Sequence, residues 1–130
     1  MKLKIIKFDS VKSTNDEAIN LINQNYLRPT LIISQYQTKG RGTMGKKWIS
    51  KKGNFFISIY FEVDSKNDFK KFAILNPYII HRILKKYSKY KVQIKWPNDL
   101  LIKKKKVCGI LQETIEFEKK NYLIIGIGIN

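Results

Sequence analysis

Six residues in the C-terminal half of the chain, Lys95-Trp96-Pro97-Asn98-Asp99-Leu100, separate two apolar runs. The run before them, Val92-Gln93-Ile94, alternates in polarity, so Lys95 is predicted to end a β-strand. Proline donates no backbone hydrogen bond, so the Trp-Pro pair should interrupt the ladder before a second strand starts at Leu100. Most lysines are simply solvated, but a lysine held at a strand end between apolar neighbours is a positioned cation. We therefore take Lys95 as a candidate functional residue.

The length of 130 residues predicts one domain that can bury a real core. No apolar run approaches the length of a membrane span, and the N-terminus alternates lysine with apolar residues, unlike a signal peptide. The single cysteine, Cys108, excludes an intramolecular disulfide and is expected in the core. Together these features predict a cytoplasmic protein without a membrane partner.

The formal net charge of +16 by itself suggests nucleic acid as a partner. The basic residues are almost all lysines spread along the chain, and only Arg28, Arg41 and Arg82 are arginines. This distribution indicates a general compositional bias more than a nucleic-acid-binding patch. A basic nucleic-acid-binding module remains the alternative from another class, and its binding would weaken steeply with salt.

The N-terminal part predicts a strand at Lys2–Phe8, a helix, and a second strand at Thr30–Tyr36. The helix should start at Ser13-Thr14-Asn15-Asp16, where Ser13 can act as the cap, and end at Asn23–Asn25. A simple helix cap is a sufficient explanation for this motif when it is taken alone.

The segment from Gln37 to Trp48 contains three glycines, Arg41 and several lysines. Glycines let backbone amides approach an anion closely, and the cations offset its charge. The segment lacks the spacing of a P-loop. A flexible surface loop is the alternative, but Trp48 at its end favours function, since its flat ring could pack against a base.

The rest of the chain predicts one helix and five strands. The strands are expected at 53–63, 91–96, 99–103, 107–117 and 122–129, with Lys103–Lys106 as a solvated turn. The helix at Phe69–Tyr87 should kink or restart near Asn76 because Pro77 interrupts it. His81 in this helix is expected to serve packing or to lie at the surface. Short connections between successive strands predict an α+β fold, with a mixed, largely antiparallel sheet and helices packed on it.

These features suit the activation of a carboxylate by ATP. In that reaction the carboxylate attacks the α-phosphate, giving a mixed anhydride and pyrophosphate. Two anions must meet, so fixed cations and backbone amides have to stabilise the charge that grows on the phosphoryl oxygens. Arg41 and Lys95 are the predicted catalytic cations, and the glycines in the strand Gly126–Asn130 allow close approach of a ligand.

The chain resembles the biotin protein ligases at motifs that occur in the same order and cover essentially its whole length. The matching residues are Ser13-Thr14-Asn15, Gln37 with the loop from Gly40 to Trp48, Lys95 to Leu100, Gly109-Ile110-Leu111 with Glu113, and Gly126 to Asn130. The resemblance implies a fold like that of biotin ligases and class II aminoacyl-tRNA synthetases. It also implies synthesis of biotinyl-AMP from biotin and ATP with Mg²⁺, then transfer of biotin to a lysine of a biotin carboxyl carrier domain of acetyl-CoA carboxylase or a related carboxylase.

The resemblance also assigns residues to each ligand. Biotin would be bound by Ser13, Thr14, Asn15, Gln37, Gly40, Arg41, Gly42, Thr43 and Lys95. ATP and the adenylate would be bound by Arg41, Gly45, Lys46, Trp48, Lys95, Asn98 and Asn130. Lys95 and Arg41 would be the catalytic residues, and the loop from Gly40 to Trp48 would close over the adenylate.

Several features depart from the family pattern. The family loop commonly has a second arginine at the position of Thr43 and often an arginine at Lys46, and lysine does not copy the bidentate binding of phosphate. Relatives usually continue past the strand Gly126–Asn130 into a C-terminal β-barrel domain, so we expect residues 1–130 to form one catalytic domain, truncated relative to the family. Because the sequence starts at the first predicted strand of that domain, we expect no repressor role and no specific DNA binding.

Two alternatives within the same fold remain open. One is a lipoate–protein ligase, although the pairing of the Lys95–Leu100 motif with the glycine-arginine loop favours biotin. The other is a degenerate remnant that binds biotin but turns over poorly. The sequence is compatible with a monomer or a homodimer, and it does not identify the carboxylase that is modified.

Overall fold

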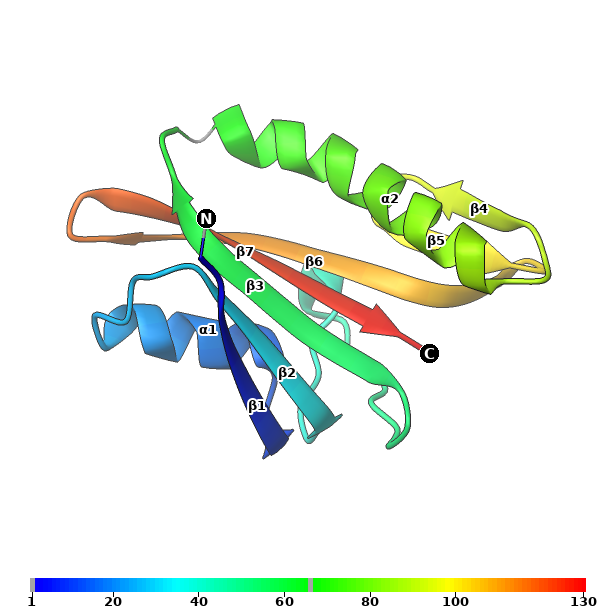
Figure 1. Cartoon of the computed structure of the whole chain (residues 1–130), viewed down its shortest axis with the longest axis horizontal. Helices are drawn as coiled ribbons and strands as arrows, with labels where there is room; N and C mark the ends of the chain where they lie inside the picture. Colours follow the sequence, from blue (N-terminus) through cyan, green and yellow to red (C-terminus); the bar gives the residue numbers. More distant parts are fainter. Residues whose placement is uncertain (1, 66) are drawn as a thin grey trace.

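The computed structural model describes residues 2–65 and 67–130. Its elements are β1 (Lys4–Val11), α1 (Thr14–Asn23), β2 (Thr30–Gln37), the short 3₁₀-helix η1 (Thr43–Gly45), β3 (Phe55–Val63), α2 (Asn67–Tyr87), β4 (Val92–Lys95), β5 (Asp99–Ile102), β6 (Lys105–Phe117) and β7 (Lys120–Ile129). The strands form a 7-stranded sheet in the order β1-β2-β3-β7-β6-β5-β4 (Figure 1). Only β1 and β2 pair in parallel, and every other described pairing is antiparallel. The predicted α+β class is confirmed.

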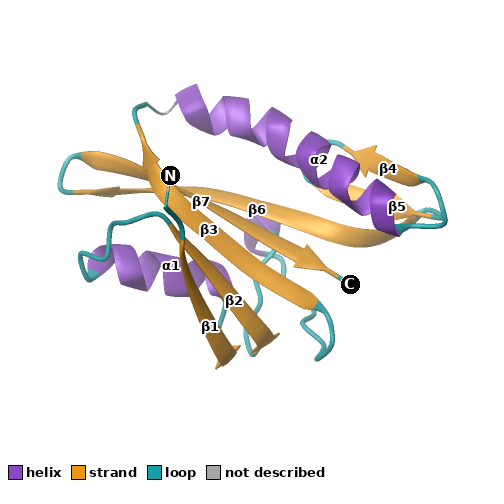
Figure 2. Cartoon of the chain, in the orientation of Figure 1, coloured by secondary structure: helices purple, strands orange, loops and turns teal. Residues whose placement is uncertain are grey.

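Helix α1 forms where the cap signal predicts it. The Ser13 hydroxyl accepts a hydrogen bond from the Asp16 backbone N–H at 3.1 Å, which satisfies one of the free N–H groups of the first turn. Ala18 and Ile22 are fully buried in one core cluster with Tyr60 of β3. Because α1 connects the parallel strands β1 and β2, its first turn lies next to the strand ends, where Figure 2 shows the helix beneath the sheet.

Helix α2 covers a second core cluster and differs from the prediction. It runs without interruption through Pro77, so the predicted restart near Asn76 does not occur. The proline ring is fully buried and its neighbour Ile80 packs with Val92, so core packing offsets the missing backbone hydrogen bond. The His81 ring Nε2 lies 2.7 Å from the Val92 carbonyl oxygen. The packing role expected for His81 is confirmed.

Two-residue turns close the C-terminal hairpins. Lys103 and Lys104 have φ values of 51° and 63°, and Glu118 and Lys119 have 49° and 64°. Positive φ at both central residues matches the twist of antiparallel strands. The turn predicted at Lys103–Lys106 is therefore shorter, and β6 already begins at Lys105.

One face of α2 is apolar and accessible to solvent. Leu75, Ile79 and Ile83 follow one another at four-residue intervals and remain 47%, 47% and 50% exposed, so they lie on one side of the helix. Along the described residues, neither helix combines the length and apolar character needed to span a membrane.

Cys108 should react slowly with alkylating agents. The side chain is fully buried, as expected from the sequence. Burial, together with the nearby Asp99 charge, raises the pKa of the Cys108 thiol to about 12, although Lys106 opposes this. Only the thiolate is nucleophilic, so alkylation by iodoacetamide at pH 8 should be more than roughly a hundredfold slower in buffer than in urea. Similar rates followed by mass spectrometry would contradict this burial.

Candidate functional site

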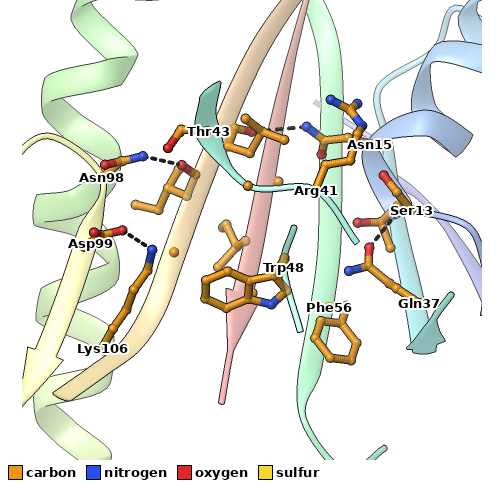
Figure 3. A pocket seen from close by; sticks show the side chains of 18 residues that line it. Ser13, Asn15, Gln37, Arg41, Thr43, Trp48, Phe56, Asn98, Asp99 and Lys106 are labelled. Carbon is orange, nitrogen blue, oxygen red and sulfur yellow. Dashed lines mark hydrogen bonds and ion pairs between the residues drawn. The ribbon is translucent and has the colours of Figure 1, made fainter. Parts of the chain in front are cut away.

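A cleft of about 440 Å³, including the space at its open mouth, lies between α1, the 38–48 loop and strands β6 and β7. Figure 3 shows polar side chains of α1 and β2 on one side, Trp48 in the middle and Lys106 on the other side. Nine residues assigned from the sequence line the cleft: Ser13, Thr14, Asn15, Gln37, Arg41, Gly42, Thr43, Trp48 and Asn98.

The polar side of the cleft is a connected hydrogen-bond network. The Thr14 backbone N–H donates to the Gln37 side-chain carbonyl at 2.8 Å. The Ser58 hydroxyl contacts both the Thr14 hydroxyl, at 2.7 Å, and the Asn15 side-chain oxygen. Asn15 itself donates to the Leu111 carbonyl at 3.2 Å. These contacts hold the polar groups of this side of the cleft in one connected arrangement.

Trp48 lies flat on two strands because glycines leave room for its ring. A Cβ atom on Gly109 would lie 2.7 Å from the indole, and a Cβ on Gly128 would lie 2.6 Å from its Nε1 atom. Among the described residues the buried indole N–H has no hydrogen-bond partner. The Lys106 ammonium lies 5.1 Å from the ring centre, within the range of a cation–π contact. Trp48 therefore forms an apolar wall of the cleft.

Arg41 is held by two carboxylates. Its guanidinium donates to both oxygens of Glu113, at 2.8 and 3.1 Å, and to Asp16 at 3.0 Å. Burial alone would raise the pKa of the Glu113 carboxyl, but hydrogen bonds from Arg41 and Asn15, with the Arg41 charge, bring the pKa below its usual value. The hydrogen bonds that Arg41 donates to Glu113, with the charges of Glu113 and Asp16, raise the pKa of Arg41, although burial opposes this. Arg41 is thus a fixed residue whose charge is already compensated.

Lys106 lines the cleft, although the sequence placed it in a solvated turn. It forms an ion pair of 2.8 Å with Asp99, which also lines the cleft and is 18% exposed. The pairing of β5 with β6 shifts by one residue next to Leu100, so Leu100 faces Cys108 whereas the next residue faces Lys106. Such an irregularity changes the direction in which a side chain points. Here it places the Lys106 side chain next to Gly109, on the side of the sheet that lines the cleft.

Five other assigned residues do not line the cleft: Gly40, Gly45, Lys46, Lys95 and Asn130. Lys95 is exposed at the end of the edge strand β4. Its partner in the neighbouring strand β5 is Asp99, so Lys95 lies one strand farther from the cleft than Asp99 does. Asn98 does line the cleft, but its side-chain amide donates to the Ile110 carbonyl at 3.2 Å. The structure therefore brings the polar group and Trp48 together, with Lys106 in place of Lys95 as the nearby lysine.

Sequence reasoning gave no role to several other lining residues. Phe56, Ile110, Leu111 and Ile127 contribute apolar walls, and Asp99 and Lys106 contribute charge. Within the described part of the chain, no group of three or more His, Cys, Asp or Glu residues could hold a metal ion.

The fold and the cleft define an α+β domain with a cleft that has polar groups on one side and apolar walls. Residues 7–130 match the model of the Biotin/lipoate A/B protein ligase family. The chain belongs to this family, which confirms the resemblance found in the sequence.

Individual relatives are biotin ligases. The chain is 35% identical over 129 residues to the bifunctional ligase/repressor BirA of Bacillus subtilis, covering 97% of this chain and 40% of BirA. It is similar to the biotin protein ligase of Aquifex aeolicus in complex with biotin and ATP (TM-score 0.75, 32% identity, 98% of this chain and 52% of that chain). It is also similar to the biotin protein ligase of Leishmania major in complex with biotinyl-5-AMP (TM-score 0.79, 26% identity, 98% and 56%). The chain thus spans less than half of the curated relative and about half of each solved chain.

Replacing Gly128 by alanine should displace Trp48. The added Cβ would lie 2.6 Å from the indole, and such overpacking typically costs about 1–3 kcal/mol. We expect a red-shifted tryptophan emission and stronger quenching by acrylamide. Trp96 is already 55% exposed, so the change would report on Trp48.

Gly42→Ala is the matched control in the loop. Its Cβ would have no neighbour closer than 3.5 Å, so emission should stay as in the unmodified protein. An unchanged spectrum in Gly128→Ala would contradict the position of the indole.

Proposed function

We propose that the chain activates biotin with ATP to form biotinyl-AMP and transfers the biotin to a lysine of a biotin carboxyl carrier domain. The observation that carries this proposal is the layout of the cleft, with polar groups at one side, apolar walls in the middle and a lysine at the far side (Figure 3). The names of the relatives and the ligands of their structures support the same substrates.

Biotin matches this layout group by group. Its ureido ring needs hydrogen-bond donors and acceptors, which Ser13, Thr14 and Gln37 would supply. Its apolar ring and chain would pack on Trp48 and Phe56. Its carboxylate would then reach toward Lys106, where the α-phosphate of ATP would also lie. A short site with pre-placed polar groups favours this orientation because unpaired buried polar groups are costly.

The chemistry needs no nucleophile from the protein. A carboxylate oxygen of biotin would attack the α-phosphorus, forming a mixed anhydride while the bond to the pyrophosphate oxygen breaks. The carrier lysine amine would then attack the acyl carbon and release AMP as the amide forms. Lys106 would stabilise the charge on the phosphoryl oxygens, and Trp48 would help exclude water from the anhydride.

We assign the catalytic cation to Lys106 in place of Lys95. Both lysines are exposed, but Lys106 lines the cleft and pairs there with Asp99, whereas Lys95 lies on the edge strand and does not line the cleft. Arg41 is proposed to hold the N-terminal end of the 38–48 loop in place, because its guanidinium is already paired with two carboxylates. Magnesium would arrive on the ATP phosphates, as Mg²⁺ usually keeps several waters and binds few protein groups.

The same proposal includes the wider setting. The acceptor would be the carrier domain of acetyl-CoA carboxylase or a related carboxylase, and the site of action would be the cytoplasm. A single catalytic domain would carry the reaction, as a monomer or a homodimer, without specific DNA binding. The net charge of +16 would speed encounter with an acidic acceptor.

Substrate choice is tested by mass spectrometry of the nucleotide products. Biotin with ATP should yield biotinyl-AMP and pyrophosphate, whereas lipoate at the same concentration should yield much less adenylate. Equal or greater formation of lipoyl-AMP would favour the lipoate ligase of the same family. Biotin binding without any adenylate would favour a degenerate remnant.

The two candidate lysines can be separated by substitution. Lys106→Ala should lower adenylate formation by roughly 10²–10³-fold, as the loss of one preorganised charge donor does. Lys95→Ala is the matched control and should stay within about threefold of the unmodified protein, since Lys95 lies on the edge strand and does not line the cleft. Pyrophosphate release measures both, and the reverse pattern would return the role to Lys95.

Thr43 should determine how well the adenylate is retained. It lines the cleft with a hydroxyl where the family commonly has a guanidinium, and a charged hydrogen bond is worth roughly 1.5–3 kcal/mol. Thr43→Arg should therefore slow dissociation of biotinyl-AMP by about ten- to a hundredfold. It should also reduce labelling of a bystander protein when a carrier domain competes. An unchanged dissociation rate would show that the loop does not control release.

A further inference from the structure

Glu113 of β6 joins the biotin-binding side of the cleft to the nucleotide-facing loop. We propose that Glu113 is a positioning residue that couples the binding of biotin to the binding of ATP. The inference rests on the proposed function and adds the residue through which the two subsites of that function communicate. The sequence motif contains Glu113, but neither its contacts nor a role for it was predicted.

The Glu113 carboxylate has partners from two separate segments. Its Oε1 atom accepts from the Asn15 side chain at 2.9 Å and from Arg41 at 2.8 Å. Its Oε2 atom accepts a second hydrogen bond from Arg41 at 3.1 Å. One carboxylate therefore contacts both the first turn of α1 and the N-terminal end of the 38–48 loop. Paired hydrogen bonds to a guanidinium also fix its orientation.

The other end of the same loop is tied to the same polar group. Gln37, which accepts from the Thr14 N–H, donates its amide to the Ser50 hydroxyl at 3.0 Å, and Ser50 donates to the Trp48 carbonyl at 3.1 Å. A continuous path of hydrogen bonds thus runs from Arg41, through the residues proposed to bind the biotin head, to Trp48. A ligand that displaces any of these polar groups must shift partners at both ends of the loop.

Asn15 has little freedom to move alone. A Cβ atom on Gly126 would clash with the Asn15 side-chain oxygen, so the amide is packed directly on β7. Biotin bound against Asn15 would therefore fix the Glu113 carboxylate, and through it the Arg41 side chain. The cost of ordering the loop would be met in part before ATP binds. By linkage, ATP would tighten biotin binding by the same factor.

The coupling can be measured with the whole chain by calorimetry. Biotin is titrated with and without saturating α,β-methylene-ATP, whose bridging carbon prevents adenylate formation. In the unmodified protein the analogue should tighten biotin binding at least about tenfold. In Glu113→Gln, which keeps the shape and an acceptor for Asn15, the factor should fall below about threefold, whatever the affinity for biotin alone, because the factor is a ratio of two affinities of the same variant.

Control variants separate coupling from stability. Glu116→Gln changes an exposed carboxylate on the same strand and should keep the full coupling factor. Asp16→Asn loosens Arg41 from its other carboxylate without touching Asn15, and should also reduce the factor. This second variant carries the test if Glu113→Gln does not fold, as judged by circular dichroism.

Three results would overturn the inference. They are an unmodified protein without coupling, full coupling in Glu113→Gln, or full coupling in a folded Asp16→Asn when Glu113→Gln does not fold. Failure of the proposed function looks different, because the unmodified protein would then bind no biotin, whether or not the analogue is present.

Discussion

The ion pair between Arg41 and Glu113 is the contact on which the site depends. It joins a loop that follows β2 to the middle of β6, 72 residues along the chain. Removing either partner would leave a charge in a half-buried position, which costs more than the pair itself contributes. The 38–48 loop, which carries Trp48, is therefore fixed to β6 at its N-terminal end. This attachment helps to determine where the loop lies over the cleft.

Glycines determine how closely the loop can approach the sheet. Gly109 and Gly128 lie on neighbouring strands and are paired with each other in the β6–β7 register. A side chain at either position would meet the indole of Trp48. The neighbouring Gly126 makes similar room for Asn15. Gly126 and Gly128, which the sequence predicts as sites of close approach, therefore make room for the protein's own Asn15 and Trp48 side chains.

Local signals predicted the fold better than the site. The cap at Ser13 and the polarity of the strands depend on neighbouring residues, so the sequence located most elements within a few residues. Lys106 was missed because its direction depends on a register shift between two strands, and nothing within its run of four lysines marks that shift. The position of Lys95 outside the lining of the cleft has a related cause. A strand end at the edge of a sheet and one at its centre have the same local pattern, and only the strand order distinguishes them.

The electrostatics of the cleft gives the site a specific constraint. Arg41 and Lys106 face three carboxylates, those of Asp16, Glu113 and Asp99. The fixed charges at and directly behind the cleft therefore do not attract a triphosphate by themselves. Attraction over longer distances must come from the lysines on the rest of the surface, whose field is screened by salt. In the proposed reaction a phosphate would have to compete with Asp99 for Lys106, and the Lys106 ammonium would move from Asp99 to the phosphoryl group as ATP binds. The pairing holds Lys106 in position until then, which reduces the ordering that the transition state would otherwise require.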